Sequence, residues 1–243
     1  MQPDIEAIFL DVGNTLRIVV EDPAFQQQAK QELMRLIDSK ESPDAFFEKV
    51  EGRWKNYRSL SKKSLLEASE LELWTQWLLP DYPVEVVAPH ISRLTRMWRD
   101  RDGRRVPRSD AKETIVELHR RGYLLGIIAN TITETEIPDW MIADGVTRYF
   151  KTVILSSKVR VRKPDPTIYW LAARVMGVEP VKCAYLGDNP IRDVEGTRAA
   201  GFGMMILFEE PATIAKEPQS GDYKPDHIIK ETRQLLDIFP PRQ

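Results

Sequence analysis

Three aspartates lie just beyond apolar stretches of the sequence and could form a reaction centre. Asp11 follows the apolar residues 8–10, and Asp188 follows residues 185–187, with Asp193 shortly after it. If these two stretches are neighbouring parallel strands, Asp11 and Asp188 meet at one edge of the sheet, where open α/β sheets bind ligands. Carboxylates held together repel each other unless a cation lies between them. With no histidine or cysteine nearby, such oxygen ligands favour Mg²⁺.

Lys163 is the candidate counter-charge for these carboxylates. It lies in residues 162–166, whose two prolines predict a rigid loop that can aim the side chain. An ammonium group held there would restrain the carboxylates and bind an anion. A loop lysine by itself is more often a solvated residue. The neighbouring Lys158, Arg160 and Arg162 do not favour a nucleic-acid site, because the run is short and has no stacking aromatic beside it.

Length and composition narrow the classes of protein. The chain has 243 residues, of which 42% are hydrophobic and 30% charged, as in a soluble globular protein with room for one domain and a sizeable insertion. A net charge of -2 gives no overall attraction for nucleic acid or an anionic membrane. The single cysteine, Cys183, excludes an internal disulfide and a cysteine metal cluster. Neither a signal peptide nor an apolar run long enough for a bilayer is found, so we expect a cytoplasmic protein without a membrane partner.

Strands and helices alternate through most of the chain, and these elements must position the charged residues. Apolar runs predict strands at residues 5–10, 123–129, 152–155, 183–186, 204–208 and, at an edge, 226–229. Caps and periodicity predict helices at residues 110–121, 136–144, 166–176, 191–200 and 231–238. Residues 211–225 read as a surface loop. The alternation predicts an α/β fold with a Rossmann-like, doubly wound parallel sheet.

A helical block interrupts this pattern at residues 21–102. Asp22 and Ser42, each followed by proline, predict two helix starts, and Ser64 with Glu67 fits a capping box that opens a third helix. A fourth helix is expected from about residue 85. The block contains four tryptophans, which we expect to fill its core rather than to line a substrate pocket: Trp54, Trp74, Trp77 and Trp98. The predicted domains are an α/β core, residues 1–20 plus 103–243, and an all-helical insertion, residues 21–102.

Taken together, these segments resemble the haloacid dehalogenase (HAD) superfamily of hydrolases. Residues 11–15 resemble its first motif, Ala129-Asn130 its second and residues 163–166 its third. Gly187-Asp188-Asn189, together with Asp193 and residues 196–201, resembles its fourth motif. Each motif is weak alone, but the combination is specific and covers essentially the whole chain. The inserted block is similar to the helical cap of the family.

The resemblance implies a Mg²⁺-dependent phosphatase that acts on a small phosphorylated substrate. Asp11 would attack phosphorus and become an aspartyl-phosphate, while Lys163 would bridge Asp11 and the phosphate. Mg²⁺ would be held by Asp11, the carbonyl of Gly13 and Asp188, with Asp193 orienting that shell. Positive charge offsets the repulsion between carboxylate and phosphate, and a covalent intermediate divides one displacement into two. A closing cap would exclude water and read the leaving group.

The sequence departs from the family pattern at two positions. Phosphatases of the family usually carry an acid–base aspartate two positions after the nucleophile, where this chain has Gly13. Losing such a group typically costs on the order of 10²–10⁴-fold in rate. The second motif usually offers serine or threonine to the phosphate, where this chain has Ala129. Asn130 and Thr131 are the candidates to replace it, through a side chain or a backbone N–H.

These departures leave other interpretations open. One is a protein of a different class, which binds metal and a phosphorylated ligand or protein partner with little or no catalysis. The phosphonate-cleaving branch of the family also lacks the second aspartate, but it uses a cap lysine, and no lysine between Lys30 and Lys63 stands out. The metal-free dehalogenase branch fits worse, because residues 187–189 keep the metal-type motif. The protein could be a monomer or a homodimer.

Overall fold

A single parallel sheet forms the centre of the computed structural model, which describes residues 4–216 and 223–242. The six strands of this sheet lie in the order β5-β4-β1-β6-β7-β8. They are β1 (Ala7–Leu10), β4 (Leu124–Ala129), β5 (Phe150–Leu155), β6 (Cys183–Gly187), β7 (Met204–Phe208) and β8 (His227–Ile229). All five pairings are parallel, which confirms the predicted doubly wound α/β fold with β8 at an edge.

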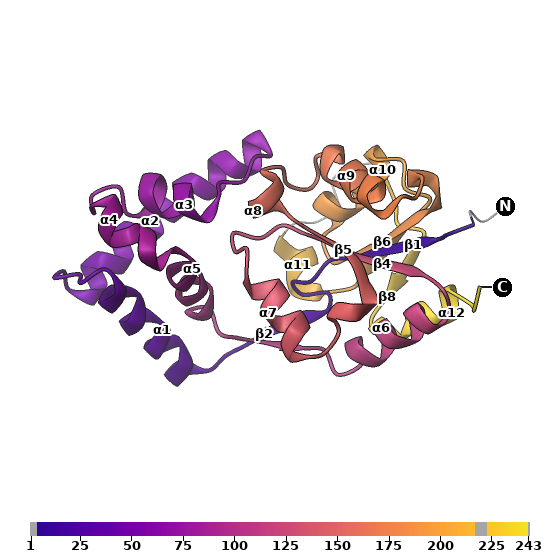
Figure 1. Cartoon of the computed structure of the whole chain (residues 1–243), viewed down its shortest axis with the longest axis horizontal. Helices are drawn as coiled ribbons and strands as arrows, with labels where there is room; N and C mark the ends of the chain where they lie inside the picture. The colour runs from indigo at the N-terminus through magenta and orange to yellow at the C-terminus, as the bar shows by residue number, and fades with distance from the viewer. Residues whose placement is uncertain (1–3, 217–222, 243) are drawn as a thin grey trace.

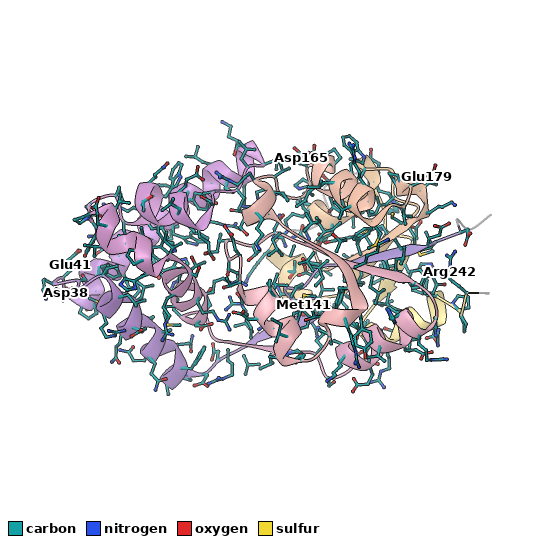
Figure 2. All side chains as sticks on the ribbon, viewed as in Figure 1. Asp38, Glu41, Met141, Asp165, Glu179 and Arg242 are labelled. Atoms are coloured by element: carbon teal, nitrogen blue, oxygen red, sulfur yellow. The ribbon has the colours of Figure 1, made fainter. Side chains whose placement is uncertain are left out.

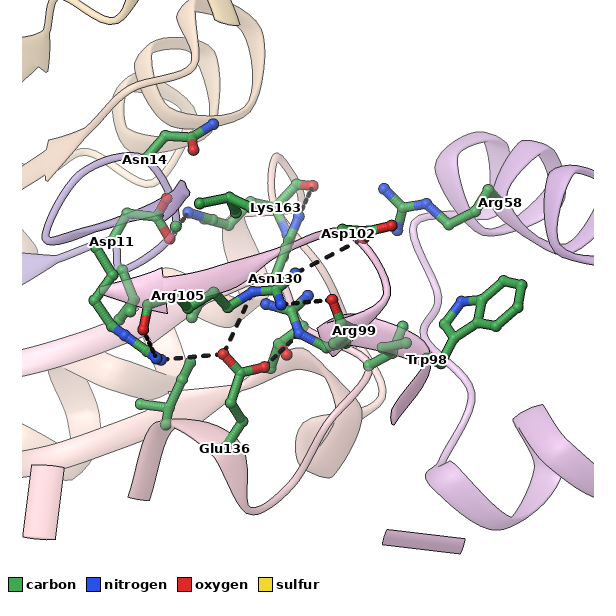
Figure 3. A pocket seen from close by; sticks show the side chains of 18 of the residues that line it. Asp11, Asn14, Arg58, Trp98, Arg99, Asp102, Arg105, Asn130, Glu136 and Lys163 are labelled. Atoms are coloured by element: carbon green, nitrogen blue, oxygen red, sulfur yellow. Dashed lines mark hydrogen bonds and ion pairs between the residues drawn. The ribbon is translucent and has the colours of Figure 1, made fainter. Parts of the chain in front are cut away.

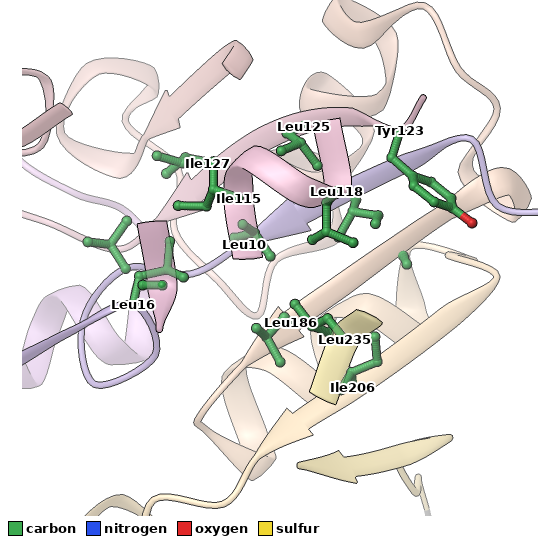
Figure 4. Close-up of a cluster of buried hydrophobic side chains, with 14 of the residues drawn as sticks. Leu10, Leu16, Ile115, Leu118, Tyr123, Leu125, Ile127, Leu186, Ile206 and Leu235 are labelled. Atoms are coloured by element: carbon green, nitrogen blue, oxygen red, sulfur yellow. The ribbon is translucent and has the colours of Figure 1, made fainter. Parts of the chain in front are cut away.

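Helices cover both faces of this sheet because side chains alternate along each strand. In β1, Ile8 and Leu10 join one buried cluster, while Ala7 and Phe9 join another. The first cluster, drawn in Figure 4, packs against α6 (Ala111–Arg120), α7 (Glu136–Ala143) and α12 (Leu235–Ile238). The second packs against α9 (Pro166–Met176) and the segment that leads into α10 (Gly196–Ala199). A short helix, α8 (Ser156–Val159), follows β5 directly.

The helical block lies at one end of the molecule and has its own core (Figure 1). Its helices are α1 (Pro23–Leu36), α2 (Pro43–Ser64), α3 (Glu70–Glu72), α4 (Val84–Val87) and α5 (Ile91–Asp100). Asp22 and Ser42 cap α1 and α2 as predicted, accepting hydrogen bonds from the backbone N–H of Phe25 and Ala45. Trp74 and Trp98 are buried in the core, whereas Trp54 and Trp77 are half-buried at its border.

The third predicted helix start was wrong. Ser64 is the last residue of α2, and Leu65 turns the chain with a left-handed φ of 58°. The capping box forms instead between Ser69 and Glu72, where the Glu72 N–H donates to Ser69 Oγ at 3.2 Å and the Ser69 N–H donates to Glu72 Oε2 at 3.0 Å. Both serines stand three residues before a glutamate, but Glu67 is taken by a buried ion pair with Arg162. A π-helical segment, Leu73–Leu78, continues α3.

Other elements besides α8 also differ from the prediction. The strands β2 (Arg17–Val20) and β3 (Arg104–Pro107) were not predicted, and they pair antiparallel where the chain leaves and re-enters the sheet domain. A helix, α11 (Pro211–Lys216), begins the stretch predicted as a surface loop, and residues 217–222 of that stretch lie outside the described residues.

Exposed charged side chains such as Asp38 and Glu179 lie near opposite ends of the molecule (Figure 2). None of the helices in the described ranges is both long and apolar enough to cross a membrane.

A buried carboxylate ties the helical block to the sheet. Glu136, on α7, pairs with Arg99 of α5, with Arg17 of β2 at 3.0 Å and with Arg105 of β3 at 3.5 Å. Burial raises the pKa of the Glu136 carboxyl, but Arg99 and Arg105 outweigh it and lower the pKa to about 2. One carboxylate therefore joins three separate elements, and it stays ionised well into the acid range.

The lowered pKa of Glu136 predicts how stability depends on pH. Its usual value is 4.5 and its folded value is about 2, so the folded protein binds fewer protons than the unfolded chain between these values. The free energy of unfolding should therefore fall as pH is lowered through this window, by at most about 3 kcal/mol from this group. Glu136→Gln should cost roughly 3 kcal/mol at neutral pH, and the difference from the unsubstituted protein should shrink in acid.

Urea unfolding followed by circular dichroism at neutral pH and near pH 3 measures this effect. Glu113→Gln is the matched control, since Glu113 is exposed on α6 and makes no ion pair with the described residues. That control should stay within about 0.5 kcal/mol of the unsubstituted protein at both pH values. An equal loss for Glu136→Gln at both pH values would show that the ion pairs do not hold the pKa low.

Candidate active site

The structure brings the three predicted aspartates together at the carboxyl edge of the sheet. Asp11 directly follows β1 and Asp188 directly follows β6, and Leu10 is paired with Leu186 across these adjacent strands. One carboxylate oxygen from each of Asp11, Asp188 and Asp193 lies within 4.8 Å of the others, and all three residues are buried. The convergence expected from the order of the segments is therefore present.

Lys163 neutralises part of this negative charge. Its side chain is 1% exposed, and its Nζ lies 3.1 Å from Asp11 Oδ1 and 2.7 Å from Asp193 Oδ1. It also donates to the Tyr185 hydroxyl oxygen at 2.5 Å, and that hydroxyl donates to the carbonyl of Ile128 at 3.0 Å. A buried ammonium group needs counter-charge and acceptors, and here two carboxylates form ion pairs with it while the Tyr185 hydroxyl accepts its hydrogen bond.

The main chain around Lys163 is held from both sides. The Asn130 side chain accepts the Lys163 N–H at 2.8 Å and donates to the Lys163 carbonyl at 2.9 Å. Arg162 forms an ion pair of 3.1 Å with Glu67 of the helical block, and both side chains are buried. The Asn130 amide therefore supports the main chain of Lys163, and Asn130 also lines the cavity described below, so its predicted contact with substrate stays a prediction.

The loop after β4 uses its polar groups for hydrogen bonds within the protein. Ala129 lines the cavity with a methyl group. The Thr131 N–H donates to Ser156 Oγ at 2.9 Å, and Thr131 Oγ1 accepts the Thr133 N–H at 3.2 Å. Thr131 lines the same cavity as Asp11, but its backbone N–H is already bonded within the protein.

Gly13 is not required by the shape of its loop. A Cβ at this position would meet no atom of the described residues within 4 Å, and its φ lies outside the left-handed region. The tight point of the loop is Asn14, with a φ of 59°. The backbone at position 13 could therefore carry a side chain without strain at its Cβ.

Thr213 is a site residue that sequence analysis missed. Its hydroxyl donates to Asp188 Oδ2 at 2.5 Å and accepts from Asn14 Nδ2 at 3.2 Å. It comes from α11, within the stretch predicted as a loop, and a single threonine there carries no pattern that points to the site. The other oxygen of Asp188, Oδ1, is buried with no hydrogen-bond partner in the described parts of the chain.

Crowding and burial shift the protonation of these carboxyls. Burial, followed by the negative charges of Asp11 and Asp193, raises the pKa of Asp188 to about 7. Burial also raises the pKa of Asp11, although Lys163 acts against it. A divalent cation would reverse both effects. The residues fit such an ion, because the donors are all oxygen and Asp188 Oδ1 has a lone pair without a partner.

A cavity of about 280 Å³ opens beside Asp11 and Lys163. The sheet domain supplies these two residues and the loop after β4, while the helical block supplies Trp54, Arg58 and Trp98 (Figure 3). Two of the four tryptophans, Trp54 and Trp98, line this cavity, and they also pack in or against the core of the helical block, as predicted. This volume suits a small molecule rather than a polymer.

Comparison with known proteins agrees with this arrangement. The chain is 31% identical over 134 residues to a glyceraldehyde 3-phosphate phosphatase from Methanopyrus kandleri, covering 54% of this chain and 56% of that protein. It is 34% identical over 137 residues to a phosphoserine phosphatase from Thermus thermophilus, covering 56% and 53%. The matches thus span little more than half the length of these curated relatives.

Structural comparison shows the same fold. A crystal structure of a 2-haloacid dehalogenase from Pseudomonas syringae has a TM-score of 0.69 at 17% identity, over 96% of this chain and 97% of that one. The family model described as haloacid dehalogenase-like hydrolase matches residues 26–207. The chain belongs to the haloacid dehalogenase-like hydrolase family.

Proposed function

We propose that this protein is a Mg²⁺-dependent phosphatase that hydrolyses a small phosphate monoester through an aspartyl-phosphate on Asp11. The observation that carries the proposal is the buried ion pair of Asp11 and Lys163, 3.1 Å apart, at a small cavity beside an all-oxygen cluster. The curated relatives described above are named as phosphatases of small phosphorylated compounds, which supports this reaction class.

In the proposed reaction, a carboxylate oxygen of Asp11 attacks phosphorus and the bond from phosphorus to the leaving oxygen breaks. The leaving oxygen takes a proton from water or from the substrate itself, because Gly13 offers no side chain. Water then attacks the phosphorus of the aspartyl-phosphate, which releases inorganic phosphate and restores the Asp11 carboxylate. Lys163 stabilises the negative charge that builds up on the phosphoryl oxygens.

The metal would be held by Asp11, the carbonyl of Gly13 and Asp188, with Asp193 orienting the group. When bound, Mg²⁺ supplies positive charge that offsets the repulsion between Asp11 and the phosphate dianion. Asp193 supports this arrangement by accepting the Asn189 N–H at 2.9 Å while it holds Lys163. Thr213 fixes one oxygen of Asp188 and leaves Oδ1 for the ion.

In the same proposal, each of the two domains has its own role. Residues 1–20 plus 103–243 form the core that holds the reacting groups, and residues 21–102 form a cap that completes the cavity and selects the substrate. Phosphate binding is assigned to Lys163 and to the loop at Asn130 and Thr131, with the Asn130 side chain acting through the Lys163 main chain.

A second candidate function is a protein that binds metal and a phosphorylated ligand with little turnover. Gly13 and Ala129 favour it, since the chain keeps the metal-type aspartates but lacks the acid–base aspartate and the hydroxyl that phosphatases of the family usually carry. The two functions differ in the effect that an aspartate at position 13 would have on phosphate release.

Asp11→Asn should abolish turnover without unfolding the protein. Amide nitrogen and oxygen are poor nucleophiles, so kcat for p-nitrophenyl phosphate with Mg²⁺ should fall by on the order of 10⁴-fold or more. Phosphate release measures the rate, and circular dichroism checks the fold. Since removal of one buried carboxylate relieves repulsion, the variant should melt no lower than the unsubstituted protein. Unchanged phosphate release would refute the role of Asp11.

Gly13→Asp should accelerate hydrolysis of esters with poor leaving groups. A Cβ at this position meets no neighbouring atom of the described residues within 4 Å, and a positioned acid typically contributes roughly 10²–10⁴-fold. We expect a gain of at least about 10-fold for ethyl phosphate and little change for p-nitrophenyl phosphate, whose leaving group needs little protonation. Steady-state phosphate release with both esters measures the contrast.

Gly13→Asn is the matched control, because it has the shape of aspartate without the acid. Equal effects of the two substitutions would contradict acid catalysis at this position. If the unsubstituted protein releases almost no phosphate from either ester and Gly13→Asp releases it from both, the binding protein would be favoured over the enzyme.

A further inference from the structure

The wall of the cavity is more basic than one phosphate group requires. Seven cationic side chains and three carboxylates line it, and a phosphate at Asp11 needs only Lys163 and the metal. The cations are Arg17, Arg58, Arg99, Arg101, Arg105, Lys163 and Arg192, and the carboxylates are Asp11, Asp102 and Glu136. The partners of these cations decide which of them remain for a ligand.

Most of these cations are already satisfied by the protein. Glu136 takes the three arginines that were described at the junction of the helical block. Arg101 pairs with Asp102 at 2.8 Å and stacks on Trp98, with 3.7 Å from its guanidinium carbon to the ring centroid. Lys163 is held by two aspartates, and Arg192 has interactions of its own.

Arg58 differs from all of them. It is half-buried and makes no hydrogen bond or ion pair with the residues that the structure describes. Among those residues its one ring contact is with Trp54, whose ring centroid lies 5.4 Å from the guanidinium carbon. Its side chain extends from α2 toward the side of the cavity that holds Lys163 and Asp11 (Figure 3). Burial and the charge of nearby Arg162 lower the pKa of Arg58 to about 10, so it remains a cation at neutral pH.

A partly desolvated guanidinium without a counter-ion is unfavourable unless a ligand supplies one. Its planar donors suit a carboxylate or a phosphate, which they can bind in a bidentate manner. The indole rings of Trp54 and Trp98 line the wall beside it and displace water, which strengthens such a pair. Arg58 and Asp11 line the same cavity of about 280 Å³, so one small ligand can reach both.

We propose that Arg58 binds a second anionic group of the substrate, so that the preferred substrates are small phosphate monoesters that also carry a carboxylate or a second phosphate. This inference rests on the proposed phosphatase activity and adds the substrate class to it. Arg58 is then a specificity-determining residue of the cap, and the reaction that supplies the substrate must yield a phosphorylated acid or a bisphosphate.

The test compares three esters that differ in one group: ethyl phosphate, 2-phosphoglycolate and ethane-1,2-diyl bisphosphate. Phosphate release with Mg²⁺ should show kcat/KM at least about 10-fold higher for one or both of the esters with an anionic tail than for ethyl phosphate, from one charge-assisted pair. The ester that leads identifies the carboxylate or the phosphate as the preferred group. Arg58→Gln should lower this ratio by roughly 10- to 100-fold, mostly through KM.

Lys55→Gln is the control, because it removes one positive charge from the same helix at an exposed position outside the cavity. It should keep the preference. Equal kcat/KM for all three esters in the unsubstituted protein, or an unchanged ratio in Arg58→Gln, would overturn the role of Arg58 while leaving the phosphatase in place. Calorimetric binding of 2-phosphoglycolate to Asp11→Asn, with and without Arg58→Gln, reports on Arg58 even without turnover. No phosphate release from any ester would count against the proposed function instead. Equal affinities of the Asp11→Asn variants with and without Arg58→Gln would still overturn the inference.

Discussion

The contact of Lys163 with two buried aspartates is the interaction on which the rest of the structure depends. Three carboxylates that converge at one sheet edge would repel each other, and burial strengthens that repulsion. A single ammonium group between Asp11 and Asp193 offsets part of it, while Asp188 keeps a raised pKa and one oxygen without a hydrogen-bond partner among the described residues. The remaining imbalance is what makes the site suited to a divalent cation.

Holding that ammonium group in place connects the site to the helical block. Asn130 binds the Lys163 main chain, and the adjacent Arg162 is paired with Glu67 of the block. On the opposite side, Glu136 joins the block to β2, β3 and α7. Both attachments are buried ion pairs, and a protein is strongly destabilised when one partner of such a pair is lost. The block is thereby placed so that Arg58 and two tryptophans complete the cavity.

Sequence analysis could predict the parts of the site that follow from local patterns. Buried parallel strands are continuous apolar runs, so the position of Asp11 and Asp188 at their ends was readable. Lys163 was found because two prolines mark its loop, and the caps of α1 and α2 because serine or aspartate precedes proline. The roles assigned to these residues stay predictions.

The remainder depends on contacts between distant segments that no local pattern records. The strands β2 and β3 are four residues each and pair only because the helical block returns the chain to its starting point. Ser64 and Ser69 offer the same capping spacing, and only the buried partner of Glu67 decides between them. Thr213 reaches Asp188 from a segment without periodicity, and Arg58 is distinguished only by the partners it lacks among the described residues.

The central claim is that Asp11 becomes phosphorylated although position 13 carries no acid. Acid-quenched mass spectrometry of the protein mixed with p-nitrophenyl phosphate and Mg²⁺ tests it most directly. The account predicts one phosphoryl group, located on Asp11 by peptide mapping and absent without the metal. Because water has no aspartate at position 13 to activate it, the adduct should build up within the first turnover. Sustained phosphate release with no adduct, or with an adduct on another residue, would contradict the account.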